Sequence, residues 1–568
     1  MTDPRDALDQ DLEPIIMAVT RADRDGAIRL AVAAFMRGQD HPLVRLLVAE
    51  GLEADGRTDE AIDLLQKVAA EAPEEAEGWR RLGDLLARRG RLEEALAALS
   101  RALDIDPDMY LTLALAGAVS FRLADLDRAE GHYRRAARLA PNEAEPLGAL
   151  AAIAARRGDA ETARDLGQRA LAQGPSLSAQ MALARADVLQ GRFQAAEDRM
   201  SRLLERRDLD PDARVGLLDL RAETRDALNR PADTFADYSA RNRLIEAGVA
   251  PRIERELAER KVEQVLRLGH YFSHTPKEPW RTAPPPDPTE PAHVFLVGFP
   301  RSGTTLLEKA LAGHPDIVTL EETDHLDRAA GHWLAGAAEL DHLARLSAAE
   351  ADLCRKDYWD GVRAQRGEAA SPKVIVDKMP LHSIALPLVA KLFPRAKILF
   401  AIRDPRDVVL SCFRRRFQIN AAMYEFLNLN RAAHFYCQVM DLVQIYRNLL
   451  PLQILDVRHE RVVADFDDEL RTILRFIGCD WDPCVRTFAE RAGSALRTPS
   501  DPQLARGLNA DGVDQWRRYA GQMAPVLAQL DPWVRHLGYS ASPRQWGYKA
   551  QILTPTSPRP IPTSPPKS

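Results

Sequence analysis

The amino-acid sequence predicts an α-helical solenoid followed by an α/β domain built on a central parallel β-sheet. Two observations support this prediction. The first half of the chain has a 34-residue periodicity, and the second half alternates short apolar runs with helical patterns. The chain has 568 residues, which is too many for one hydrophobic core, so at least two domains are expected.

The periodicity of the first half is set by prolines and small residues. Pro73, Pro107, Pro141 and Pro175 are separated by 34 residues each. The clearest copy is "AEGWRRLGDLLARRGRLEEALAALSRALDIDPDM", residues 76–109. It matches the repeat pattern at Trp79, Leu82, Gly83, Ala95, Ala102 and Pro107.

This copy resembles the tetratricopeptide repeat, a pair of antiparallel helices. Small residues at Gly83, Ala95 and Ala102 would let the two helices approach closely, and Gly90 would permit the turn between them. We therefore expect a solenoid over residues 8–245. A scaffold role and a groove that binds a peptide or partner protein both remain open, because a fold does not determine a function.

Proline-rich segments border the second half of the chain. Residues 246–291 are predicted to form a helix and a proline-rich linker, and the tail 541–568 is predicted to be disordered. The net charge of −6, an acidic N-terminus and the absence of a long apolar run argue against nucleic-acid and membrane partners. With five cysteines and no CxxC pair, we expect reduced thiols and a cytoplasmic location.

The second domain is predicted over residues 292–540. Its apolar runs, expected to be strands, cover residues 293–299, 317–321, 374–379, 396–403 and 452–458. Helical patterns separate these runs, which is typical of a parallel sheet covered on both faces. Ligands bind such sheets beyond the carboxyl ends of the strands.

The first apolar run leads into Gly298–Thr305, "GFPRSGTT". This segment is similar to the phosphate-binding loop G-x-x-x-x-G-K-[ST], with Thr304 in place of the lysine. Backbone N–H groups of such a turn still bind an anion. A sulfuryl group bears less negative charge than a γ-phosphoryl group, so Arg301 could serve it without lysine or metal.

"PRSGTT" resembles the 5′-phosphosulfate loop of sulfotransferases that use 3′-phosphoadenylyl sulfate (PAPS). The resemblance implies that the donor's 5′-phosphosulfate is bound by Arg301, Ser302, Gly303, Thr304 and Thr305. The alternative is that the two threonines merely begin a helix.

A second motif, "AKILFAIRDPRDVVLSCF", has Arg403 at a strand end and Ser411 on the next helix. In the same family these two residues bind the 3′-phosphate. An arginine fork and a hydroxyl can converge on one phosphate. The alternatives are that Arg403 pairs with Asp404 or Asp407, and that Ser411 is an ordinary helix residue. The basic run 414–416 could add positive potential near the nucleotide, but such a run is more often a solvated face, and we leave it out of the site.

Two further segments resemble the tyrosylprotein sulfotransferases. "HPDIVTLEETDHL" implies that Glu322 is the catalytic base, with Glu321 beside it. "VIVDKMP" implies that Lys378 stabilises the transition state or the leaving phosphate, although Asp377 stands where the family has asparagine. The alternatives are a capping or salt-bridged acid at Glu322 and an exposed lysine at the strand end.

"RTPSDPQLARGLN" resembles a loop of the same family in which a serine helps to hold the donor, and that serine corresponds to Ser500. His459 and Glu460, after the last strand, resemble a Tyr-Glu pair of the family, and we expect them to be structural.

As a whole, the chain resembles the bacterial tetratricopeptide-repeat sulfotransferases. The resemblance implies PAPS as co-substrate, no metal, and a hydroxyl acceptor, with peptide tyrosine as one candidate. A homodimer is one possible assembly. Two alternatives stay open. One is a nucleoside-phosphate kinase, and the other is a non-catalytic scaffold with a nucleotide-binding domain.

Overall fold

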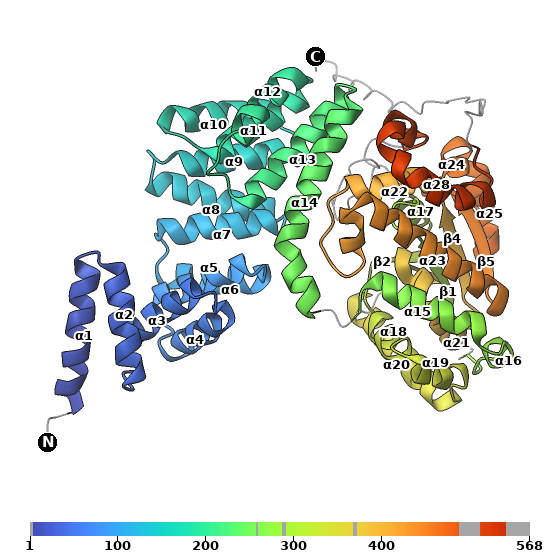
Figure 1. Cartoon of the computed structure of the whole chain (residues 1–568), viewed down its shortest axis with the longest axis horizontal. Helices are drawn as coiled ribbons and strands as arrows, with labels where there is room; N and C mark the ends of the chain where they lie inside the picture. The colour runs from blue at the N-terminus through green and yellow to red at the C-terminus, as the bar shows by residue number, and fades with distance from the viewer. Residues whose placement is uncertain are drawn as a thin grey trace, which may run out of the picture. The chain divides into compact units, whose positions relative to one another are not determined.

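The computed structural model describes residues 4–256, 259–286, 291–366, 372–487, 510 and 512–540, without the side chains of 4–11, 256 and 366. Ser500 and the tail 541–568 therefore lie outside the described residues. The chain divides into two compact units, Met1–Asn229 and Arg230–Ser568. Figure 1 shows the helices and strands of both units.

The first unit is a succession of antiparallel helix pairs, which confirms the predicted helical solenoid. Its helices are α1 Pro4–Thr20, α2 Arg24–Met36, α3 Pro42–Ala54, α4 Thr58–Glu71, α5 Ala76–Arg88, α6 Leu92–Ile105, α7 Tyr110–Arg122, α8 Leu126–Leu139, α9 Ala144–Arg156, α10 Ala160–Gln173, α11 Leu177–Leu189, α12 Phe193–Leu204 and α13 Pro211–Ala227. Gly90, between α5 and α6, has a φ of +79°, which explains why glycine occupies this turn.

Close contact between α5 and α6 depends on the small residues of the repeat. A Cβ atom at Gly83 would lie 2.6 Å from Cγ of Leu99 and 3.2 Å from the carbonyl oxygen of Ala95. Ala95 and Ala102 of α6 are fully buried. The repeat therefore uses small side chains to bring two helix backbones together.

The helix after the solenoid belongs to the second unit. Helix α14 Pro231–Glu256 includes Arg241, which is fully buried and donates hydrogen bonds to the carbonyl oxygens of Phe413 and Arg414 at 3.2 and 3.0 Å. The predicted solenoid extends to residue 245, whereas these contacts group α14 with the α/β part of the chain.

The second unit is built on a parallel sheet of five strands in the order β2-β3-β1-β4-β5. Its strands are β1 Ala292–Gly298, β2 Ile317–Glu321, β3 Val374–Lys378, β4 Lys397–Ile402 and β5 Gln453–Arg458. All five lie within a residue or two of the predicted apolar runs, so the predicted fold class is confirmed.

Both faces of this sheet are covered. Along β1, Phe295 and Val297 pack into one core, whereas Val294 and Leu296 pack into the other. This alternation explains why the strand is apolar without interruption. The covering elements are α15 Lys261–His274, α16 Glu278–Arg281, α17 Thr304–Leu311, α18 Asp327–Trp333, α19 Ala337–Ala344, α20 Ala348–Arg366, η1 Pro380–Ala385, α21 Leu386–Leu392, α22 Pro405–Arg414, η2 Met423–Leu427, α23 Leu429–Leu449, α24 His459–Ala464, α25 Phe466–Ile477, η3 Pro483–Thr487, η4 Gln515–Tyr519 and α28 Ala520–His536.

The strand order places the predicted site residues at one edge of the sheet. β1 lies between β3 and β4, so the connections from β1 and from β3 leave toward opposite sides. Such a switch point is where open parallel sheets bind ligands. In register, Glu321 lies beside Lys378, and Gly298 beside Ala401. None of the helices in the described parts of the chain is long and apolar enough to cross a membrane.

A pair of glycine substitutions tests the helix contact in the solenoid. Gly83→Ala should lower the free energy of unfolding by about 1–3 kcal/mol, because the added methyl group overlaps Leu99. Gly131→Ala, in α8 with no atom within 4 Å of the new Cβ, should raise it by about 0.5–1 kcal/mol. Urea unfolding followed by circular dichroism measures both, and equal effects of the two variants would contradict the packing argument.

Candidate active site

The turn between β1 and α17 has the backbone geometry of an anion-binding loop. Arg301 and Gly303 have φ values of +71° and +99°, so the chain turns sharply before α17 begins at Thr304. At the start of the turn, a Cβ on Gly298 would lie 2.7 Å from the carbonyl oxygen of Ala401, so only glycine fits beside β4. The turn therefore directs the N–H groups at the start of α17 to the edge of the sheet.

The structure brings the two predicted donor motifs together. Nε of Arg301 donates to Oγ of Ser411 at 3.0 Å, across 110 residues of sequence. One terminal nitrogen of Arg403, Nη1, donates to the carbonyl oxygen of Arg301 at 2.9 Å, and the other, Nη2, donates to the carbonyl oxygen of Gly512. Arg301, Arg403 and Ser411 thus lie together.

The predicted alternative, that Arg403 forms an ion pair with Asp404 or Asp407, is not what the described parts of the structure show. The carboxylate of Asp407 accepts the backbone N–H groups of Asp514 and Trp516. Asp404 pairs with Arg406 at 2.6 Å and accepts the backbone N–H that begins α22. Nε of Arg403 is buried and has no hydrogen-bond partner in the described parts of the chain. A buried guanidinium donor without a partner is available to a bound anion.

Positive charge is concentrated around the loop. Burial, followed by the charges of Arg415 and Arg403, lowers the pKa of Arg301 to about 9. The members of the basic run 414–416, which was left out of the predicted site, differ in their contacts. Arg414 lies over the ring of Tyr519 at 4.9 Å, whereas the charge of Arg415 acts on Arg301. Only the structure could separate these neighbours.

His459 borders the same loop. A Cβ at Gly303 would lie 2.6 Å from Nδ1 of His459, so the loop and the imidazole are in close contact. Desolvation, with the charges of Arg403 and Arg301, lowers the pKa of His459 to about 3, so the ring is neutral at physiological pH. From the sequence, His459 was expected to be structural. The feature of the sequence that could have indicated this contact is the position of His459 directly after β5.

Glu460, in contrast, makes structural contacts. Its carboxylate accepts the backbone N–H of Asp404 at 3.0 Å and the hydroxyl of Tyr539 at 2.7 Å. It therefore ties the start of α22 to the segment after α28.

The other predicted pair, Glu322 and Lys378, lies at the ends of β2 and β3. Nζ of Lys378 donates to Oε1 of Glu322 at 2.8 Å. Lys378 is fully buried, so the alternative of an exposed lysine at the strand end is wrong, whereas the side chain of Glu322 is 45% exposed. Glu322 has a φ of +48°, a left-handed conformation that is rare outside glycine and frequent at functional sites.

The two adjacent glutamates have different partners. Oε2 of Glu321 accepts a hydrogen bond from Lys309 at 2.9 Å, and its Oε1 lies 3.7 Å from Lys378. Glu321 is thus held between two lysines, whereas Glu322 faces solvent. The charge of Glu322 also acts on Arg301, which links this pair to the loop.

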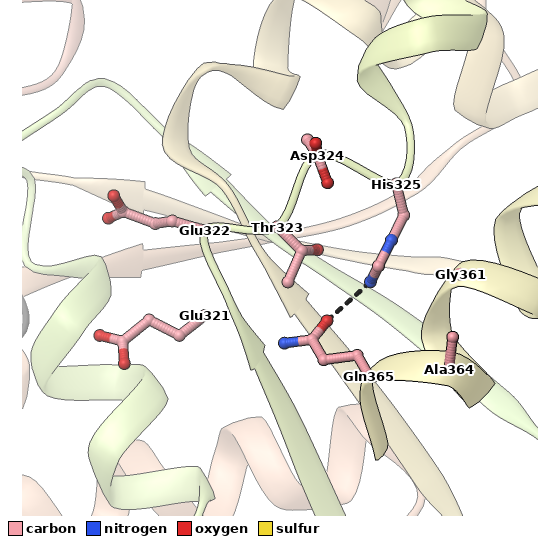
Figure 2. A pocket seen from close by; sticks show the side chains of 8 residues that line it. All are labelled: Glu321, Glu322, Thr323, Asp324, His325, Gly361, Ala364 and Gln365. Atoms are coloured by element: carbon pink, nitrogen blue, oxygen red, sulfur yellow. Dashed lines mark hydrogen bonds between the residues drawn. The ribbon is translucent and has the colours of Figure 1, made fainter. Parts of the chain in front are cut away.

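A pocket opens beside Glu322 (Figure 2). Its lining consists of Glu321, Glu322, Thr323, Asp324, His325, Gly361, Ala364 and Gln365. The residues come from the end of β2, from the segment that follows it and from the end of α20. Within the residues that the structure describes, no cluster of three or more His, Cys, Asp or Glu could hold a metal ion. The predicted donor residue Ser500 is outside the described residues.

Comparison with known proteins agrees with this arrangement. Residues 291–483 match the model of a sulfotransferase family, and residues 46–110 and 119–178 match a tetratricopeptide-repeat model. An uncharacterised protein of Aquifex aeolicus is 26% identical over 43% of this chain and 33% of its own length. The protein-tyrosine sulfotransferase of Drosophila melanogaster is 26% identical over 45% of this chain and 53% of its own length.

The protein-tyrosine sulfotransferase 1 of Danio rerio is also 26% identical, over 45% of this chain and 74% of its own length. The chain therefore spans a third of the Aquifex protein and about half of the Drosophila enzyme. The chain combines tetratricopeptide repeats with a sulfotransferase-family domain that is similar to the protein-tyrosine sulfotransferases.

Proposed function

We propose that this protein transfers a sulfuryl group from PAPS to a hydroxyl acceptor. The main support is the hydrogen bond from Arg301 to Ser411, together with the contact of Arg403 with the loop carbonyl of Arg301. These contacts support the proposal because they bring together the loop proposed to hold the phosphosulfate and the arginine proposed to bind the 3′-phosphate. Either motif alone is compatible with an ordinary strand-to-helix turn, whereas the pair suits a ligand with anionic groups at two positions.

In this proposal the donor is held by its two anionic ends. The N–H groups of the turn and the side chains of Arg301, Ser302, Thr304 and Thr305 bind the 5′-phosphosulfate, and Gly303 lets the backbone approach it. Ser302, Thr304 and Thr305 are buried, so their hydroxyl groups are shielded from bulk water. Arg403 and Ser411 bind the 3′-phosphate, and Nε of Arg403, which has no partner among the described residues, supplies a donor for it.

The transfer itself is an in-line displacement at sulfur. The acceptor oxygen forms a bond to sulfur while the bond from sulfur to the 5′-phosphate oxygen breaks, and 3′-phosphoadenosine 5′-phosphate leaves. Glu322 takes the acceptor proton, because it is the solvent-facing carboxylate of the pair. Lys378, buried beside it, supplies positive charge for the negative charge that develops on the leaving group. The residues proposed to act need no metal.

The acceptor proposal draws on the relatives. Two of them are named protein-tyrosine sulfotransferases, so peptide tyrosine is one candidate acceptor. A phenol suits a carboxylate base, because it is more acidic than an alcohol. The repeats would then bind a substrate or partner, or act as a scaffold.

The kinase alternative is disfavoured by Thr304. A γ-phosphoryl group carries several negative charges, and phosphate loops that transfer it use a lysine at this position together with magnesium.

Calorimetry on the full chain tests the proposed function. The bisphosphate product, 3′-phosphoadenosine 5′-phosphate, should bind without magnesium with a dissociation constant of about a micromolar or tighter. ATP with magnesium should bind weakly, because the loop lacks the lysine. Tight ATP binding with no bisphosphate binding would favour the kinase. If neither nucleotide binds, the non-catalytic scaffold becomes the better interpretation.

Substitution of the proposed base separates binding from chemistry. Glu322→Gln should bind the bisphosphate normally and lose transfer by about 100- to 10,000-fold, the usual contribution of a general base. The amide oxygen can still accept the hydrogen bond from Lys378, so the buried lysine keeps a partner. Glu322→Asp should retain part of the activity. Full transfer by the glutamine variant would remove Glu322 from the base role.

A matched pair of glycine variants tests the loop. Gly303→Ala should weaken bisphosphate binding by about tenfold or more, because the new Cβ meets His459 and displaces loop N–H groups that hydrogen-bond a charged ligand. Gly478 has a similar φ of +91° and open space around it. Gly478→Ala should cost about 1 kcal/mol in unfolding free energy and leave binding unchanged. Unchanged binding by the Gly303 variant, measured by calorimetry, would contradict the proposed donor site.

A further inference from the structure

The pocket beside Glu322 has a floor formed by close contact of two elements. A Cβ at Gly361 of α20 would lie 2.7 Å from Nδ1 of His325, so the imidazole rests directly on the helix backbone. Nε2 of the same ring hydrogen-bonds to Oε1 of Gln365 at 2.7 Å, as Figure 2 shows. His325 and Gln365 therefore form a fixed polar edge one helix turn long.

Thr323 adds a hydroxyl group that forms no hydrogen bond within the described part of the chain. The residue is only 8% exposed, and its Oγ1 is buried without a hydrogen-bond partner in the described parts of the chain. Figure 2 shows this hydroxyl on the side of the pocket that faces His325 and Gln365. A buried hydroxyl without a partner costs free energy unless a ligand or water satisfies it.

The carboxylates of the lining are not equally neutralised. Glu321 is paired with Lys309 and Glu322 with Lys378. Asp324 is exposed, and its carboxylate has neither an ion pair nor a hydrogen bond to the side chains that the structure describes. The residue that decides the charge at this pocket is therefore Asp324.

Positive charge acts instead on the phosphate loop. The charges of Arg403 and Arg415 act on Arg301 in the phosphate loop, where the donor's anionic groups would lie. The described residues that line the pocket include no lysine or arginine. The site is thus divided into a cationic half for an anion and an anionic half beside the proposed base.

We propose that the acceptor binds in this pocket, with its hydroxyl at Glu322, and that Asp324 selects acceptors that are cationic or neutral near that hydroxyl. Thr323, His325 and Gln365 supply hydrogen bonds to the acceptor. An acidic acceptor would bring its negative charge against Asp324, which no basic side chain of the described lining offsets. This proposal depends on the proposed sulfotransferase function and adds the charge class of its substrate.

Three phenols of nearly the same shape test the charge preference: tyramine, 4-ethylphenol and 4-hydroxyphenylacetate. Tyramine carries a positive charge and 4-hydroxyphenylacetate a negative charge, each at about the same distance from the phenol hydroxyl. 4-Ethylphenol carries no charge. Binding of each is measured by nuclear magnetic resonance on the full chain saturated with the bisphosphate product, and transfer is measured as bisphosphate released from PAPS. Tyramine should be favoured over 4-hydroxyphenylacetate by about tenfold or more in both measurements.

Substitutions of residues that line the pocket should change the preference among the three phenols without changing bisphosphate binding. Asp324→Asn should reduce the tyramine preference to about threefold or less, with unchanged bisphosphate affinity. Thr323→Val keeps the shape of the side chain, and should weaken binding of all three phenols without affecting their order. Asp360→Asn, on α20 but outside the lining, should change neither, because Asp360 pairs with Arg363 on the surface.

The outcomes distinguish this proposal from the proposed function. Suppose that the bisphosphate binds. The acceptor proposal is then overturned by any of three results: a preference for the anionic phenol, no charge preference, or no binding of any phenol. In each of these cases the proposed donor site stands. If the charge preference is present but Asp324→Asn leaves it unchanged, Asp324 is not the selecting residue. If the bisphosphate itself does not bind, the sulfotransferase function fails first.

Discussion

The hydrogen bond from Arg301 to Ser411 is the interaction on which the site depends. It joins the loop after β1 to the helix after β4, and Arg403 supports it by donating to the backbone oxygen of Arg301. The loop can adopt this conformation because Gly298 and Gly303 leave room for Ala401 and His459. The guanidinium groups of two arginines are thereby held close together in a poorly solvated place, which is costly unless an anion binds.

The different environments of the Glu321 and Glu322 carboxylates follow from the backbone conformation. Glu321 is the last residue of β2 and pairs with Lys309 on α17, whereas the positive φ of Glu322 turns the chain away from the strand. The turn exposes one carboxylate and leaves the other between two lysines. A strained residue at the end of a strand thus creates a solvent-facing acid next to a fully buried lysine.

Most of the fold was predictable because its signals are local. Five continuous apolar runs predicted the five strands, and prolines and small residues at a 34-residue spacing predicted the helix pairs. The candidate site residues Arg301, Lys378 and Arg403 could be named from the sequence because they lie in motifs that follow strands. His459 and Arg415 could not be separated from their neighbours Glu460 and Arg414, because the neighbours have the same local signals and instead make structural contacts.

By itself, the sequence determined the solenoid, the parallel sheet and the strand ends at which charged residues gather, since periodicity and apolar runs specify local structure. The tertiary structure decided which of those charges meet. A hydrogen bond across 110 residues and the pairing of Glu321 with Lys309 depend on strand order and on helix packing. The same packing leaves the carboxylate of Asp324 without a partner among the described side chains. Side-chain partners are set by three-dimensional neighbours, and no spacing along one chain encodes them.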